Sequence, residues 1–139
     1  MDNYIKIGKL NKKLFKELNI DIITDEVVFT FERKEHVESK RLQLYEEIKE
    51  ILPLVIYKPD CIYKDWNNRD NTLVFIKAID NNNSIDIVIK IAITNDEKHP
   101  KNSIITMMKI GPKTYNKIKR NKSANLIFEK TGQKWINIV

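Results

Sequence analysis

The chain has 139 residues, 42% of them hydrophobic, which suits one domain with an ordinary core, and we expect a single domain over residues 1–139. Its apolar runs are broken by charged residues and fall far short of the roughly 20 residues needed to cross a bilayer, so no membrane partner is expected. The first residues lack the layout of a secretory signal and Cys61 has no cysteine to pair with, so a reducing, cytoplasmic location fits best.

The net charge of +6 is unevenly distributed along the chain. Residues 98–139 carry a single acid, Glu129, against ten basic side chains: Lys98, Lys101, Lys109, Lys113, Lys117, Lys119, Arg120, Lys122, Lys130 and Lys134. A field of one sign suits a phosphate backbone or another polyanion, most readily RNA. An alternative is a genome biased toward A and T, which also enriches Lys, Asn and Ile.

In chain order, the first half is expected to be mainly helical. We expect a short strand at 4–7, a short helix at 11–18 and extended pieces at 20–24 and 27–29. A long helix is expected to begin after Thr30, whose hydroxyl can cap it, and to run toward Leu52. Its apolar residues recur at three- and four-residue steps and predict a stripe buried against a sheet. Pro53 and Pro59 are expected to bracket an irregular turn that leads into 61–66.

The second half predicts an antiparallel meander. Strands are expected at 72–79 and 84–93, joined by a hairpin turn at 80–83, and a further strand at 103–110. In the second of these strands, isoleucines at every other position face one side, while Asp86, Val88 and Lys90 face the other. Pro112 is expected to start a basic helix that runs to about Asn121, and the apolar residues 126–128 could add a last anchor.

No metal-ligand spacing, phosphate-binding glycine loop, nucleophile elbow or paired-cysteine motif occurs in the sequence, so no metal and no cofactor are expected. Acid–base groups and fixed cations remain, and these suffice for metal-independent RNA cleavage by the 2′-hydroxyl. His36 leads the candidates because imidazole titrates near neutral pH. Arg33, His36 and Lys40 share one helical face. An ordinary solvated surface histidine is the competing interpretation, and His99, in a polar loop, reads as incidental.

Two further features point to an anion. Lys90 lies in mid-strand, where an unpaired ammonium must meet either water or an anion, and a solvated strand face explains it equally well. Ser103 and Thr106 supply hydroxyl donors for a phosphate oxygen. Three positions separate them, so they face opposite sides of a regular strand and only a bulge would align them.

These residues together resemble a family, the phage-associated nucleases of the Barnase-EndoU-Colicin-RelE fold. The resemblance covers about residues 20–130 and rests on the order and spacing of short segments: 30–37 opening a helix, 59–65 after it, the Ile-rich strand with Lys90, and 102–106. It implies an α+β fold in which about four antiparallel strands pack against N-terminal helices, with a ribonuclease site on the exposed sheet face.

The resemblance also implies roles for single residues. His36 would be the acid or base, Lys90 and Arg41 would hold the scissile phosphate, and Ser103 or Thr106 would orient it. Many relatives carry a second histidine where this chain reads Lys40-Arg41, and an arginine is too basic to accept a proton readily. Arg33, Lys40, Lys109 and Lys113 are expected to bind the rest of the RNA.

The leading hypothesis is therefore a metal-independent endoribonuclease, associated with a prophage or a toxin, that cleaves single-stranded or tRNA-like RNA and could have an inhibitor or immunity protein. Two alternatives stay open. The chain could be a nucleic-acid-binding module without catalysis, as the missing second histidine suggests. It could also be a protein-interaction domain whose basic surface meets an acidic partner.

Overall fold

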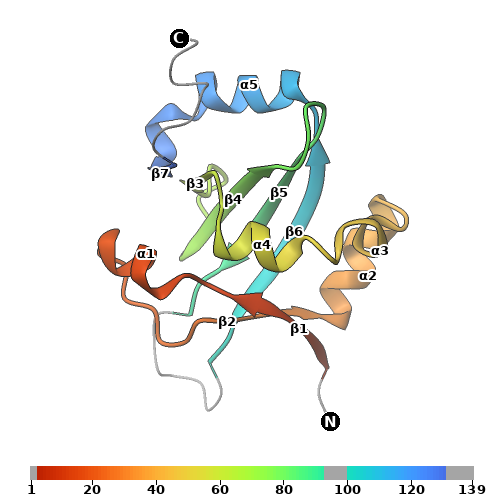
Figure 1. Cartoon of the computed structure of the whole chain (residues 1–139). Coiled ribbons are helices and arrows are strands. Elements are labelled where there is room, and N and C mark those ends of the chain that lie inside the picture. Colours follow the sequence, from red (N-terminus) through yellow and green to blue (C-terminus); the bar gives the residue numbers. More distant parts are fainter. Residues whose placement is uncertain (1–2, 93–99, 131–139) are drawn as a thin grey trace.

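A computed structural model describes residues 3–92 and 100–130, and they form one twisted seven-stranded sheet with helices on both faces (Figure 1). The strand order is β1-β2-β6-β5-β4-β3-β7. The strands are β1 (Tyr4–Lys9), β2 (Glu26–Thr30), β3 (Cys61–Lys64), β4 (Thr72–Ala78), β5 (Ser84–Lys90), β6 (Asn102–Ile110) and β7 (Leu126–Glu129). The helices are α1 (Lys12–Glu17), α2 (Phe31–Lys40), α3 (Leu44–Ile48), α4 (Leu52–Tyr57) and α5 (Pro112–Asn121), followed by a 3₁₀ turn, η1 (Ser123–Asn125).

The α+β class is as expected, but the sheet of about four antiparallel strands is wrong. Strands β3 to β6 do form an antiparallel meander, joined between β4 and β5 by the expected turn at 80–83. The sheet continues beyond it, however, because β2 pairs in parallel with β6 and brings β1 with it, while β7 pairs with β3. Nor are all helices N-terminal to the strands, since α5 follows β6.

The parallel junction is held by one buried amide. The Asn102 side chain donates to the carbonyls of Thr24 and Glu26 and accepts from the backbone N–H of Ala92. These hydrogen bonds tie the start of β6 to the segment before β2 and to the end of β5. An amide with no exposed surface that satisfies three backbone groups fixes the position of β2.

The long helix expected from Thr30 to Leu52 is three helices, α2, α3 and α4. Its start is confirmed, since the Thr30 hydroxyl accepts from the backbone N–H of Arg33 at 3.1 Å. Helix α2 ends at Lys40, and Gln43 takes a left-handed conformation with φ of 61°. Pro53 lies in the first turn of α4, where a missing N–H costs no hydrogen bond, so the irregular turn expected there is helical. The apolar stripe is nonetheless buried.

Each sheet face has its own core. Helices α1 to α4 pack on one face, where they cover Ile85, Ile87, Ile89 and Ile91 together with β4 residues. The other face carries the smaller core of Cys61, Tyr63, Val74, Ile76, Val88 and Ile110, and α5 packs on it through Tyr115 and Ile118. The open sheet face expected from the sequence is thus partly covered by α5. Within the described residues, none of the helices is both long and apolar enough to cross a membrane.

Candidate nucleic-acid interface

A bulge in β6 aligns three of the residues predicted to contact a phosphate. Lys90 pairs with Ser103 and Val88 pairs with Thr106, and the register shifts between these pairs because β6 carries one extra residue. Directly paired residues of antiparallel strands share a face. Lys90, Ser103 and Thr106 therefore lie on the α5 side of the sheet, and the bulge that the sequence required for this alignment is present.

Asp86 lies on the same face, two residues along β5 from Val88 and opposite Met108. Asp86 is only 5% exposed, and this burial raises the pKa of its carboxyl to about 7. The positive charge of Arg41 opposes the shift and the negative charge of Asp65 adds to it. No described residue donates a hydrogen bond to the carboxyl. Asp86 can therefore exchange a proton near neutral pH, as an acid–base group requires.

The Asp86 carboxyl faces a pocket of about 380 Å³ between the sheet and α5, which we call the α5 pocket. Its lining includes Trp66, Asp86, Met108, Lys117, Ile118 and Lys122. Most of the surface inside the pocket is apolar. Of the two lysines, Lys117 lies on α5 and Lys122 directly follows it. The pocket thus combines an apolar wall, one buried carboxyl and nearby cations, which is a common composition of small-ligand sites.

One wall of the α5 pocket is fixed by an ion pair. Asp65, at the end of β3, accepts from the backbone N–H groups of Asn67 and Arg69 and from Arg69 Nε at 2.6 Å. This closes the tight turn that carries Trp66. The indole then meets the Tyr63 ring edge-on, with 6.0 Å between the ring centroids. Trp66 is therefore held in place by Tyr63, which precedes it, and by the turn that Asp65 and Arg69 close around it.

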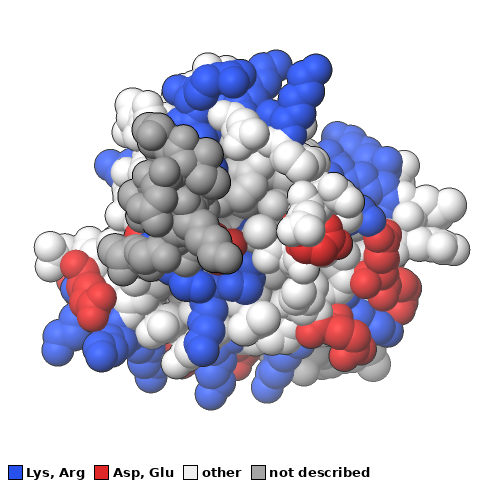
Figure 2. Space-filling view, turned by 45° about the horizontal axis from the view of Figure 1, so that its top comes forward, with Lys and Arg blue, Asp and Glu red and all other residues white. Residues whose placement is uncertain are grey.

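Five basic residues form what we call the α5 ridge: Lys113, Lys117, Lys119, Arg120 and Lys122. Figure 2 shows Lys and Arg side chains gathered along the upper part of the molecule, with no acidic side chains among them. Lys119 and Lys122 lie over the rings of Tyr115 and Trp66, at 4.8 and 5.8 Å from the ring centroids. Charges in the last turn also favour the helix dipole, so the ridge has a structural role as well.

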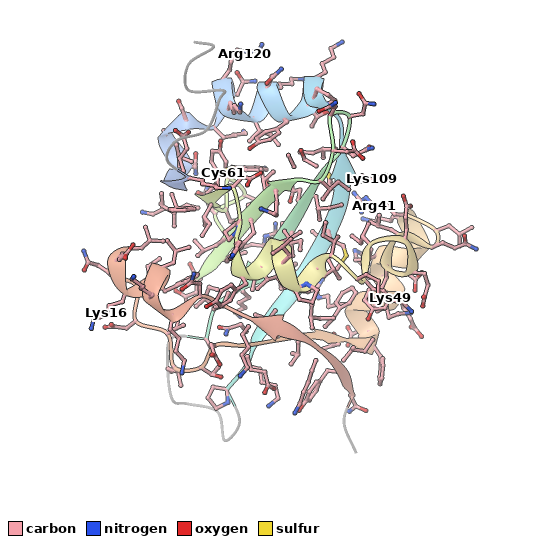
Figure 3. All side chains as sticks on the ribbon, viewed as in Figure 1. Lys16, Arg41, Lys49, Cys61, Lys109 and Arg120 are labelled. Atoms are coloured by element: carbon pink, nitrogen blue, oxygen red, sulfur yellow. The ribbon has the colours of Figure 1, made fainter. Side chains whose placement is uncertain are left out.

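Arg41 directly follows α2, and its positive charge lowers the pKa of Asp86. Figure 3 shows Arg41 beside the edge of β6, in the same region as Lys109. His36 is exposed on α2, and no hydrogen bond or ion pair among the described residues links its imidazole to Arg41, Lys90 or the β6 hydroxyls. The structure places Lys90, Ser103 and Thr106 on one sheet face but, among the described residues, links none of them to the His36 imidazole by a hydrogen bond or ion pair.

The remaining predicted residues are spread over the surface. Arg33 and Lys40 are exposed on α2, and Lys113 is exposed in the first turn of α5. Lys109 forms an ion pair with Glu47 of α3. Because Lys109 pairs with Ile85, its side chain leaves the sheet on the face opposite Asp86. Lys109 thus lies on the sheet face opposite Lys90, Ser103 and Thr106, and the other three cations stand on helices α2 and α5.

Two other features carry no comparable chemistry. A larger hollow of about 690 Å³ lies between α1 and residues 19–25, but it includes none of the predicted site residues and no buried carboxyl. Cys61, labelled in Figure 3, is buried under α5 with its Sγ 3.5 Å from the Tyr115 hydroxyl, and burial raises its thiol pKa to about 11. A thiol with so high a pKa is a poor nucleophile. His99 lies outside the described residues.

Sequence reasoning placed Asp86 on the correct strand face but did not select it as a functional residue. The signal that could have indicated Asp86 was an acidic residue between Ile85 and Ile87, in a strand apolar enough to be central in its sheet. Trp66 was missed because the turn that holds it depends on Asp65 and Arg69. A search of the chain against protein-family models, curated proteins and solved structures finds no match, so the resemblance to phage-associated nucleases stays a prediction.

Proposed function

We propose that this protein binds RNA through the α5 ridge. The observation that carries the proposal is a helix of one charge sign: among residues 100–130 the only acid is Glu129, in β7. The ten residues of α5 span about 15 Å, and a stacked single strand advances roughly 3.4 Å along its axis for each nucleotide and its phosphate. The ridge is therefore long enough for about four phosphates. A cytoplasmic location belongs to this proposal.

Salt dependence tests the proposal. Binding of a fluorescent RNA oligonucleotide should weaken with salt, with a logarithmic slope of about −0.7 for each phosphate neutralised. The variant Lys113→Gln/Lys117→Gln/Arg120→Gln should lower the magnitude of that slope by about 2. A control, Lys6→Gln/Lys9→Gln/Lys58→Gln, removes the same charge from exposed positions outside the ridge. Equal effects of the two variants would mean that only net charge matters.

A second candidate is the metal-independent endoribonuclease, with a prophage or toxin setting. It is supported by the row of Lys90, Ser103 and Thr106, which shares a sheet face with a carboxyl whose pKa is raised to about 7 by burial. In this proposal Lys90 and the hydroxyls hold the phosphate. Either His36 or Asp86 takes the proton of the 2′-hydroxyl as that oxygen bonds to phosphorus, and then gives it to the 5′-oxygen as the bond from phosphorus to that oxygen breaks. Asp86, unlike His36, lies on the same sheet face as Lys90, Ser103 and Thr106.

Cleavage in EDTA, followed by detection of cyclic-phosphate ends, tests this second candidate. Loss of cleavage in Asp86→Asn, with His36→Ala unaffected, would assign the proton transfer to Asp86, and the reverse pattern would assign it to His36. RNA that is bound but never cut would leave the binding function alone. A protein that ignores RNA at low salt would instead point to an acidic protein partner, such as an inhibitor protein.

A further inference from the structure

We propose that the α5 pocket receives one unpaired nucleobase of the bound RNA, with Asp86 hydrogen-bonded to the edge of the base and the neighbouring phosphates on α5. The inference rests on the proposed RNA binding and adds a substrate class to it, namely single strands. A base within a duplex has its edge paired and its faces stacked, so it cannot enter the pocket.

The shape and lining of the pocket suit a base. Its volume of about 380 Å³ falls in the range of small-ligand sites. Trp66, Met108 and Ile118 provide apolar and aromatic walls, and bases stack on aromatic side chains regardless of sequence. Lys117 and Lys122 stand in the same lining, where they can hold the phosphates on either side of an inserted base.

Asp86 is the polar group that such a pocket would need. Asp86 is only 5% exposed, and among the described residues none forms a hydrogen bond with its carboxyl. Because Asp86 lines the pocket and has no hydrogen bond from a described residue, its carboxyl is free to hydrogen-bond the edge of an inserted base. In its neutral form a carboxyl offers a donor beside an acceptor. Every base presents the complementary pair on its edge, so insertion should tolerate any sequence.

Four charged groups act on or near Asp86. Lys117 and Lys122 line the pocket from α5 and the residue that follows it, Arg41 approaches from the end of α2, and Asp65 lies beyond β3. Burial is the largest influence and raises the pKa of Asp86 to about 7. Below that pH the carboxyl is neutral and can donate. Above it, the charged form loses the donor and repels phosphate, so insertion of adenine, cytosine or uracil should weaken as pH rises through about 7, and the probes therefore contain no guanine.

The test compares three probes of equal charge by fluorescence anisotropy: a single-stranded RNA octamer, the same octamer with abasic riboses, and a short hairpin whose loop is a non-nucleotide linker, so that all of its bases are paired. At pH 6 the native chain should bind the octamer about tenfold more tightly than the abasic probe or the hairpin, from one stacked base. At pH 8 this preference should shrink. Thr114→Trp, at an exposed position that lines the pocket, fills the space without changing charge and should remove the preference.

The variant Asp86→Asn provides the second arm, because an amide also offers a donor beside an acceptor at every pH. It should keep the preference and lose its decline between pH 6 and 8. Equal binding of the octamer and its abasic form, or a full preference in Thr114→Trp, would overturn base insertion while leaving phosphate binding intact. Failure to bind any of the three probes would instead refute the proposed RNA-binding function.

Discussion

Asp86 should make the stability of the protein depend on pH in a direction opposite to that of most carboxylates. Its pKa is about 7 in the folded chain against an ordinary value of 3.8, mainly because of burial. The folded state therefore holds the proton more tightly than the unfolded state does. The stabilisation is complete below pH about 4, declines as pH rises from about 4 to about 7, and changes no further once both states are ionised.

The size of the effect follows from the two pKa values. Each tenfold difference in proton affinity is worth about 1.36 kcal/mol, so this carboxyl costs the folded state roughly 4 kcal/mol at pH 8 relative to a neutral group. Asp86→Asn has a similar shape and cannot ionise. Its free energy of unfolding should equal that of the native chain to within about 1 kcal/mol near pH 4, and exceed it by roughly 4 kcal/mol at pH 8.

Urea unfolding at pH 4.5, 6, 7 and 8 measures this difference directly. Asp80→Asn serves as a control of opposite sign, because hydrogen bonds from the backbone of Asn82 and from Asn83 lower the pKa of Asp80. That variant should lose stability above the ordinary carboxyl pKa and approach the native chain as pH falls. A difference between Asp86→Asn and the native chain that stays constant from pH 4.5 to 8 would show that Asp86 does not titrate in this range.

Three further changes have defined outcomes in urea unfolding at pH 7. Asn102→Ala should lower the free energy of unfolding by about 3 kcal/mol, since it removes three hydrogen bonds at the parallel junction; a loss below 1 kcal/mol would contradict that role. Arg69→Ala should lower the free energy of unfolding by about 1–2 kcal/mol, because the buried Asp65 carboxylate loses its ion-pair partner. The loss is moderate because Arg69 itself is 40% exposed, and Trp66 emission should shift to the red. Thr30→Ala should cost about 1 kcal/mol through loss of the cap on α2, whereas Thr30→Ser should cost less than half as much.

Local patterns predicted the elements that depend on local chemistry. The β-branched alternation in β5, the turn of Asp and Asn residues at 80–83 and Pro112 at the start of α5 each act within a few residues, so they could be read correctly. The break of the long helix near Gln43 could not, because no Gly or Pro marks it. Packing of α3 and α4 on the sheet overrides the helical preference of that segment.

The candidate site shows the same division. The sequence predicted that Lys90, Ser103 and Thr106 contact a phosphate and that a bulge is needed to align them, but only the pairing of β5 with β6 supplies that bulge. His36 was favoured because of its side-chain chemistry. Asp86 emerged only from burial, since an aspartate takes on an unusual pKa when the fold removes it from water.

By itself, the sequence determined the α+β class, the meander of β4 to β6, the strand face of each β5 residue and the basic character of the last third. These depend on composition, on a period of two and on turn residues, all of which act over short distances. The tertiary structure decided the parallel junction at Asn102, the additional strand β7 and the placement of α5 over Asp86. These depend on contacts between residues far apart in the chain, where burial and pairing outweigh local preference.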